Sequence, residues 1–436
     1  MEPLLVGCLG VLALAVLLIA GVHIGIALGV VGLLGLTLLI GGKAALSAVA
    51  SGSFHFITSI EFIVFPLFTL MGLVAMYGGI SEATFDALSR VLGRLPGGLG
   101  IATVVGCAAF GTVCGSSVVT ATVFAKVGCP EMRRHGYDKR LAYGIVSSAG
   151  MIGMLIPPST LAVVYGLITG ESIGALLIAG IGPGLLMALL FTAGIIVMVR
   201  IRPGLAPPVS VRFTLRQRVV GLTKLWPMGL TALVIIGGIY GGVATVTESA
   251  AWGALVIIII SVLWGKMRWK QLWNALGESV AIMGMVFLLM SGAKVFSRFL
   301  TVSGVGQYLV NAIVGAEPAI WQLLVGMVVV YLILGCFLDS ISMLLITIPV
   351  IYPILKTIGI EPMWFAMVCI VAIETGLMTP PVGFNVYGVK SVAEPDVTLE
   401  NIFAGVLPFV IMTVVGVGLL IVFPAIANWL PSHIVA

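Results

Sequence analysis

Charge is scarce in this sequence, and its scarcity excludes a soluble protein. Only 8% of the 436 residues are charged, whereas 60% are hydrophobic and the mean hydropathy is +1.24. A soluble domain carries about 25% charged residues. The chain therefore belongs in a bilayer, and at about 20 residues per spanning helix its length accommodates about ten to fourteen passes. No soluble domain fits in the remainder.

Motifs for catalysis, metal binding and export are missing too. No Walker-type Gly-Lys-Ser/Thr loop is present, which excludes ATP hydrolysis in this chain. Ser116 and Ser117 have no histidine partner in view for nucleophilic catalysis, so we expect no enzyme. The six cysteines form no CxxC pair and are interpreted as small buried apolar residues. The N-terminus lacks a signal peptide's basic region and cleavage site, so the run from Pro3 to Ala20 is expected to be a retained first helix.

One unusual construction is present twice. Gly111-Thr-Val-Cys-Gly-Ser-Ser117 is followed some forty residues later by Gly153-Met-Leu-Ile-Pro-Pro158. Gly335-Cys-Phe-Leu-Asp-Ser340 is followed at nearly the same distance by Gly376-Leu-Met-Thr-Pro-Pro381. The shift is 224 residues between the two Gly-Ser strings and 223 between the two Pro-Pro pairs.

These strings should break helices inside the membrane. Clustered glycines and paired prolines interrupt backbone hydrogen bonding, and hydrocarbon tolerates such breaks only where they line a protein-enclosed cavity. Matching breaks in two halves are the sequence sign of a secondary transporter's binding site. We therefore predict an all-α integral membrane protein, with re-entrant hairpins at 99–125 and 319–353 and unwound spans at 141–168 and 363–389.

Basic residues give the predicted orientation. Three clusters should be cytoplasmic by the positive-inside rule, at 126–140, 200–224 and 266–270, so the net charge of +5 reflects loops and not nucleic-acid binding. Arg90 and Arg94 precede the first hairpin, which would enter from the cytoplasm, whereas the second would enter from the outer face. The predicted organisation is an inverted repeat: 1–200, a cytoplasmic connector at 201–225, and 226–436. The connector is either an amphipathic interfacial helix or a basic linker.

Two sodium sites are predicted at the breaks, because freed carbonyls and hydroxyls make a neutral oxygen cage for a small cation. Helix termini at the hairpin tips could also hold an anionic substrate group. For any single Gly or Ser the alternative is close helix packing. The candidate residues of the first site are Gly111, Ser116, Ser117, Gly150, Gly153 and Pro157, and those of the second are Gly335, Asp339, Ser340, Thr375, Gly376, Thr379 and Pro380.

Three acidic residues in apolar surroundings leave alternatives open. Asp339 either binds the coupling cation or shuttles a proton, or it is a protonated structural carboxyl that is hydrogen-bonded to neighbouring backbone. Glu248 either caps a helix beginning near Thr245 or lines the cavity, and capping is favoured. Glu374 lies next to the second site or faces a neighbouring helix. Glu61 and His55 are expected at a helix end near the interface, and His23 is not expected to be a ligand.

Five strings, in order along the chain, carry a family resemblance: Phe65-Pro-Leu-Phe68, Gly111 to Ser117 with Thr120, Ile156-Pro-Pro-Ser159, Gly237 to Gly242 with Thr247-Glu248, and Met378-Thr-Pro-Pro-Val-Gly383. They resemble the large membrane subunit of TRAP transporters, the tripartite ATP-independent periplasmic transporters of bacteria and archaea. The resemblance covers essentially the whole chain.

The resemblance implies an elevator-type carrier of the ion transporter superfamily, with scaffold and transport domains, in the bacterial or archaeal inner membrane. It implies a separate small four-helix membrane subunit, a periplasmic substrate-binding protein, Na⁺ as coupling ion, and a carboxylate substrate: a C4-dicarboxylate, a sialic acid, or another sugar or keto acid. Two alternatives remain. One is a self-sufficient dicarboxylate or citrate carrier of the same superfamily, and the other is a channel or a non-transporting scaffold.

Overall fold

The protein is helical throughout the part of the chain that the structure describes. This computed structural model describes residues 2–57, 60–207, 214–264, 267–315, 319–335 and 338–434, and every regular element within them is a helix. Five of these helices are long and apolar enough to cross a membrane, or up to eight spans if each of three bent pairs counts as one. Apolar helices of 10–17 residues accompany them. The all-α prediction is confirmed, and the number of passes stays a prediction.

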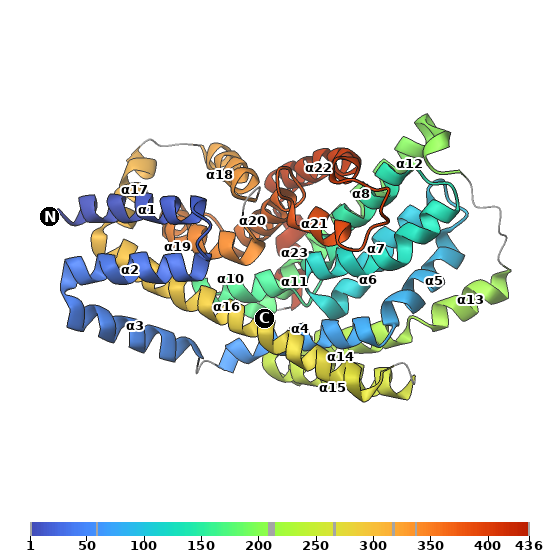
Figure 1. The fold of residues 1–436 in the computed structure, drawn as a ribbon, viewed down its shortest axis with the longest axis horizontal. Coiled ribbons are helices and arrows are strands. Elements are labelled where there is room, and N and C mark those ends of the chain that lie inside the picture. The colour runs from blue at the N-terminus through green and yellow to red at the C-terminus, as the bar shows by residue number, and fades with distance from the viewer. Residues whose placement is uncertain are drawn as a thin grey trace.

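One group of helices surrounds α16 (Trp269–Ser303), which has 35 residues and runs obliquely across the molecule (Figure 1). Helix α16 packs on α2 and α4, and α4 packs on α15. A Cβ on Gly292 would lie 2.2 Å from the Gly25 carbonyl oxygen, so glycine lets α16 and α2 approach closely. The other members are α1 (Pro3–Ile19), α2 (Ile24–Ile40), α3 (Gly42–Ile57), η1 (Ile60–Ile63), α4 (Val64–Tyr77), α14 (Trp226–Tyr240), α15 (Val246–Leu263) and α17 (Val305–Gly315).

The second group contains two hairpins and two broken helices. The hairpins are α6 (Gly98–Cys114) with α7 (Ser117–Arg134), and α18 (Ile320–Gly335) with α19 (Ser340–Ile358). The broken helices and their neighbours complete the group: α5 (Ile80–Leu92), α8 (Lys139–Ala149), α9 (Ile152–Leu155), α10 (Thr160–Thr169), α11 (Ile173–Ala179), α12 (Ile181–Ile201), α20 (Pro362–Gly376), α21 (Phe384–Lys390), α22 (Leu399–Val422) and α23 (Ala425–Ile434).

The breaks fall where the sequence placed them. Helix α6 ends at Gly115, whose φ of 61° is the left-handed conformation that glycine adopts without strain, and α7 starts again after Ser116. The segments on either side of Pro157–Pro158 are bent by 44°. Pro157–Pro158 and Pro380–Pro381 are both cis. The depth of the hairpins in the membrane, their re-entrant character and the inverted repeat stay predictions.

Two local predictions can be compared with the structure. Part of the connector is indeed a helix, α13 (Leu215–Thr223), which packs on α5; residues 208–213 lie outside the described part of the chain. The boundaries of the two repeats and the interfacial role of the connector stay predictions. Glu248 has the favoured capping role: its carboxylate accepts the Thr245 N–H at 2.7 Å, and the Thr245 hydroxyl accepts the Glu248 N–H at 3.2 Å.

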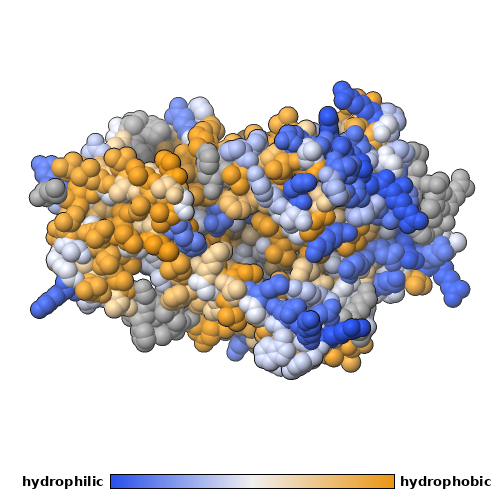
Figure 2. Space-filling model, viewed as in Figure 1, coloured by the Kyte–Doolittle hydropathy of each residue, from blue (hydrophilic) through white to orange (hydrophobic). Residues whose placement is uncertain are grey.

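Polar and apolar residues separate along the molecule. Figure 2 shows hydrophobic residues over the end that contains α1 and α2, and hydrophilic residues gathered at the opposite end, over α7, α12 and α13. Large apolar side chains face outward on many helices, among them Leu38 (70% exposed), Leu189 (68%) and Leu233 (67%), as expected where lipid replaces water. At the hydrophilic end Arg133 forms ion pairs with Glu394 and Asp396, which link the two halves.

Candidate functional site

The first hairpin lies directly against the first broken helix. A Cβ on Gly111 would come 2.5 Å from the Cα of Gly153, and a Cβ on Gly150 would come 2.6 Å from the Ser117 carbonyl oxygen. The Gly115 carbonyl accepts hydrogen bonds from the Thr160 hydroxyl at 2.9 Å and the Thr160 N–H at 3.3 Å. The tip of the hairpin is therefore tied to the start of α10 across the Pro-Pro break.

The second hairpin repeats this packing. A Cβ on Gly335 would come 2.4 Å from the Cα of Gly376, and a Cβ on Gly376 would come 2.6 Å from the Tyr331 carbonyl oxygen. The Thr375 and Thr379 hydroxyls donate to the carbonyls of Val371 (2.6 Å) and Gly376 (2.7 Å). In both halves, glycine lets a hairpin helix touch the backbone of a broken helix, which is the packing role that the sequence left as the alternative for single glycines.

Asp339 begins the second helix of its hairpin. Its Oδ1 atom accepts the N–H groups of Ile341 and Ser342, each at 3.1 Å, and its Oδ2 atom is bonded to the Ser342 hydroxyl. These contacts make Asp339 the N-cap of α19, as in the structural alternative from the sequence. Its half-buried carboxylate also lines a cavity. Binding of the coupling ion by Asp339 stays a prediction.

The two hairpin tips meet at this cavity, which has a volume of about 190 Å³. Ser116 and Ser117 reach it from the first tip, and Asp339 and Ser340 reach it from the second. Helices α4 and α16 of the other group close it. The full lining is Phe65, Thr69, Leu73, Cys114, Ser116, Ser117, Val118, Val119, Met154, Thr160, Ile282, Met285, Asp339, Ser340 and Ile341.

Three helices begin at the cavity wall: α7 at Ser117, α10 at Thr160 and α19 at Ser340. The first turn of a helix has N–H groups without intrahelical partners and carries the positive end of the helix dipole. Among the described residues, no lysine or arginine lines the cavity. Asp339 caps α19 and Ser159 accepts the Ala162 N–H of α10, whereas α7 has no side-chain cap. The start of α7 is therefore the place where backbone N–H groups and hydroxyl groups can hold a small anion.

A group of polar side chains lies buried beside the first tip. Glu374 on α20 is 0% exposed, and its carboxylate faces the Ser117 hydroxyl and the Asn385 amide without hydrogen-bond geometry. Within the described residues, the side-chain polar atoms of Ser117, Thr120 and Asn385 also have no hydrogen-bond partner. Buried polar atoms without partners are costly, so this group marks a place where a ligand, an ion or water can supply the missing contacts.

The structure brings four of the thirteen predicted residues together at one cavity. Ser116, Ser117, Asp339 and Ser340 meet at one cavity, whereas the glycines serve the packing on either side of it. Pro157 is buried and Pro380 is exposed. Sequence reasoning missed Asn385 and the cavity role of Thr160. The signal for Asn385 was present: it is an uncharged polar residue two positions after the Gly383 that ends the second break.

The chain is similar to known proteins along most of its length. The chain matches the family model described as "Tripartite ATP-independent periplasmic transporter, DctM component" over residues 11–426. It is 31% identical to the C4-dicarboxylate TRAP transporter large permease protein DctM of Pseudomonas aeruginosa, over 91% of this chain and 92% of that protein. It is 28% identical to the ectoine TRAP transporter large permease protein TeaC of Halomonas elongata, over 95% and 96%.

A longer relative and a solved structure add to this picture. The chain is 29% identical to the sialic acid TRAP transporter permease protein SiaT of Haemophilus influenzae, and the match covers 86% of this chain but 61% of that protein. The crystal structure of the YdaH transporter of Alcanivorax borkumensis, described as having an unusual topology, matches with a TM-score of 0.64. The match covers 99% of this chain and 100% of that one at 17% identity, so this likeness concerns the fold alone.

Proposed function

Because this chain belongs to the family of DctM components of tripartite ATP-independent periplasmic transporters, we propose that it is the large permease subunit that imports a small carboxylate across the inner membrane of a bacterium or archaeon, driven by sodium. The observation that carries the proposal is the cavity between the hairpin tips. It places hydroxyl groups from both repeated strings beside the first turns of three helices.

Sodium coupling rests on the chemistry of the tips. Na⁺ favours neutral oxygen ligands of the kind that unwound backbone and hydroxyl groups provide. Ser117 has a buried hydroxyl without a partner, and Ser116 and Ser340 expose polar atoms at the cavity. Since no lysine or arginine of the described part of the chain lines the cavity, two bound cations would also offset the charge of a dicarboxylate. Asp339 and the backbone around Thr379 and Pro380 would complete the second site.

The size of the cavity favours a small substrate. A volume of about 190 Å³ holds about six waters at roughly 30 Å³ each. This is below the usual range of about 300–1,000 Å³ for pockets that hold drug-sized ligands. A C4-dicarboxylate fits this cavity volume better than a sialic acid, which would require the cavity to widen. Among the relatives, the P. aeruginosa DctM protein is named for C4-dicarboxylates.

An elevator movement suits the arrangement of the helices. The hairpins and broken helices form one packed group, and the cavity lies between this group and α4 and α16 of the other. If the group of hairpins and broken helices slides along α16 and carries the tips with it, the cavity moves between the two faces of the membrane. We propose that a small four-helix membrane subunit widens the group around α16, and that a periplasmic binding protein delivers the substrate.

Reconstitution tests the proposal. The chain and its small subunit are placed in liposomes with an inward sodium gradient, and the ligand-loaded binding protein is added outside. Uptake should be low until that addition, should saturate, and should disappear when K⁺ replaces Na⁺. Saturable sodium-driven uptake by the chain alone would instead support the self-sufficient carrier, and a non-saturating, gradient-independent flux would support a channel.

A further inference from the structure

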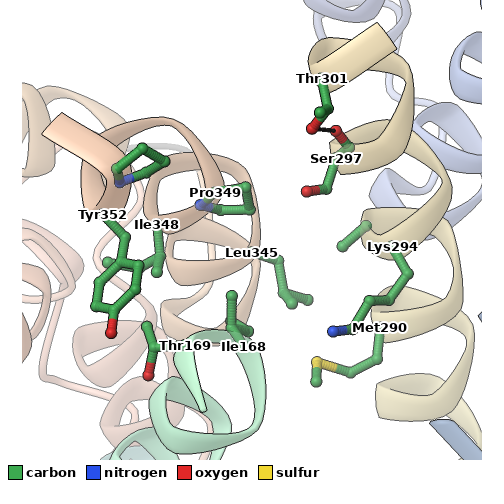
Figure 3. A pocket seen from close by; sticks show the side chains of 12 residues that line it. Ile168, Thr169, Met290, Lys294, Ser297, Thr301, Leu345, Ile348, Pro349 and Tyr352 are labelled. Atoms are coloured by element: carbon green, nitrogen blue, oxygen red, sulfur yellow. Dashed lines mark hydrogen bonds between the residues drawn. The ribbon is translucent and has the colours of Figure 1, made fainter. Parts of the chain in front are cut away.

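A second cavity lies between the two helix groups, beyond the one at the hairpin tips. It has a volume of about 250 Å³ and lies between α16 on one side and α10 and α19 on the other. Figure 3 shows Lys294 extending from α16 into this space, with Ser297 on the next turn and Thr169 and Tyr352 on the opposite wall.

The two cavities follow each other along the same three helices. Helix α10 lines the central cavity at Thr160 and the second at Ile168 and Thr169, and α19 lines them at Ser340 and Tyr352. On α16, Met285 borders the central cavity, and Lys294 lies nine positions further, which is about 13 Å along the axis. The second cavity thus continues the first toward the end of α16 that lies away from the basic residues Arg268 and Lys270, so it lies on the predicted outer side.

Lys294 has no counter-charge in this space within the described ranges of the chain. Among the described residues, no carboxylate lies within ion-pair distance of its ammonium group, and it makes no hydrogen bond. On the opposite wall, the Tyr352 hydroxyl is bonded to the Glu171 carboxylate. A lysine within an apolar helix is costly and usually marks a ligand path, and its three N–H donors suit a carboxylate.

We propose that Lys294, with the Ser297 hydroxyl, forms an outer anion-binding site that holds the carboxylate substrate on its way to the cavity between the hairpin tips. This inference rests on the proposed import of a carboxylate. The site is separate from the tips: α16 belongs to the other helix group, so the lysine stays in place when the hairpins move. Its task is to raise the local concentration of the anion and to release it inward.

Thiol labelling tests the site without relying on transport. Thr169→Cys places a half-buried thiol on the wall facing Lys294, in a Cys8→Ser background that removes an exposed native thiol. The protein is held in phosphatidylcholine vesicles, so that no anionic lipid headgroup competes. Membrane-impermeant anionic and cationic thiosulfonates are added from outside, and the background protein without the new cysteine corrects for the remaining thiols.

The anionic reagent should react at least ~5-fold faster than the cationic one, because one uncompensated positive charge favours approaching anions. Lys294→Met should abolish this preference and Lys294→Arg should keep it. Arg298→Met is the matched control, since Arg298 lies on the same helix but does not line this cavity. Succinate, used as a dicarboxylate probe, should slow labelling in the Lys294 protein more than chloride does at equal ionic strength, but not in Lys294→Met.

Each failure has a separate meaning. Absence of labelling from outside would show that the cavity is closed to the outer solution and would overturn the inference. A preference that survives Lys294→Met, or labelling that succinate leaves unchanged, would overturn the lysine's role in binding a carboxylate. Neither result touches the proposed function, which is tested separately by uptake into liposomes with the sodium gradient, the small subunit and the binding protein.

Discussion

Replacing Gly335 by alanine tests whether the close packing of hairpin and broken helix holds the site together. The new Cβ would lie 2.4 Å from the Cα of Gly376 and 2.6 Å from its carbonyl carbon, and a separation below 3.0 Å is essentially never observed for a real Cβ. Both neighbouring atoms are backbone, so a rotamer change cannot relieve the overlap. The hairpin must move away by about 1 Å to reach the 3.4 Å of ordinary contact.

Overpacking of this kind costs about 1–3 kcal/mol, and here the displacement also moves Ser340 and Asp339 at the tip. We expect Gly335→Ala to have a lower apparent melting temperature in detergent than the unsubstituted protein. We expect the sodium dependence of its uptake to be affected more strongly than its melting temperature. Melting curves with and without Na⁺, and uptake by the reconstituted complex, measure the two effects. Gly111→Ala, which faces Gly153 at 2.5 Å, should behave similarly.

Gly326→Ala is the matched control on the same helix. Nothing lies within 4 Å of its added Cβ, and alanine at an exposed helical position is favoured over glycine by up to about 1 kcal/mol. Gly335→Ala should therefore lower the melting temperature, and Gly326→Ala should raise it. If Gly335→Ala melts at the same temperature as Gly326→Ala and transports with unchanged sodium dependence, the tight packing of α18 on α20 does not hold the site and the reasoning fails.

Three further predictions concern the tips and their surroundings. Ser116→Leu and Ser340→Leu should each abolish sodium-dependent uptake at near-normal expression, and undiminished uptake with unchanged sodium dependence in both would remove the cation-cage argument. Asp339→Asn should keep the N-cap of α19, whereas Asp339→Ala should lose about 1 kcal/mol of stability. If both variants show weaker apparent sodium affinity, the charge of Asp339 is responsible for the lost affinity. If sodium affinity and uptake rate are unchanged in both variants across pH, Asp339 is a structural residue. Glu374→Gln should fold normally and show less thermal stabilisation by Na⁺, and an unchanged sodium response would show that the buried carboxylate does not contribute to ion binding.

The sequence predicted the breaks because backbone chemistry determines them locally. Glycine and proline change the backbone wherever they occur in an apolar run, so the left-handed turn at Gly115 and the interruption at Pro157–Pro158 could be located without a structure. The N-cap at Thr245 with Glu248 is equally local, since the partners are three positions apart. Periodicity and composition were sufficient for these features.

Features that depend on tertiary packing were not predictable in the same way. Ser116 and Ser340 are 224 residues apart, and their meeting at one cavity depends on how four helices cross. Gly111 and Gly335 illustrate the difference: their repetition was visible, but only the contacts with Gly153 and Gly376 show that they serve packing. Asn385 was missed although it lies two positions after Gly383, because a single amide has no periodic pattern that would place it beside Glu374.

The repeated construction is similar in backbone and different in surroundings, and this difference bears on mechanism. Pro157 and Pro158 are buried, whereas Pro380 and Pro381 are exposed. The first tip has no side-chain cap at Ser116, while the second is capped by a carboxylate at Asp339. A site whose break is not covered by the rest of the chain and that carries a charge can exchange a cation faster than one enclosed by packed glycine and proline. In a sodium-coupled cycle, the second break is therefore the better place for an ion that binds and leaves in each cycle, and the first is the better place for one that holds the hairpin closed.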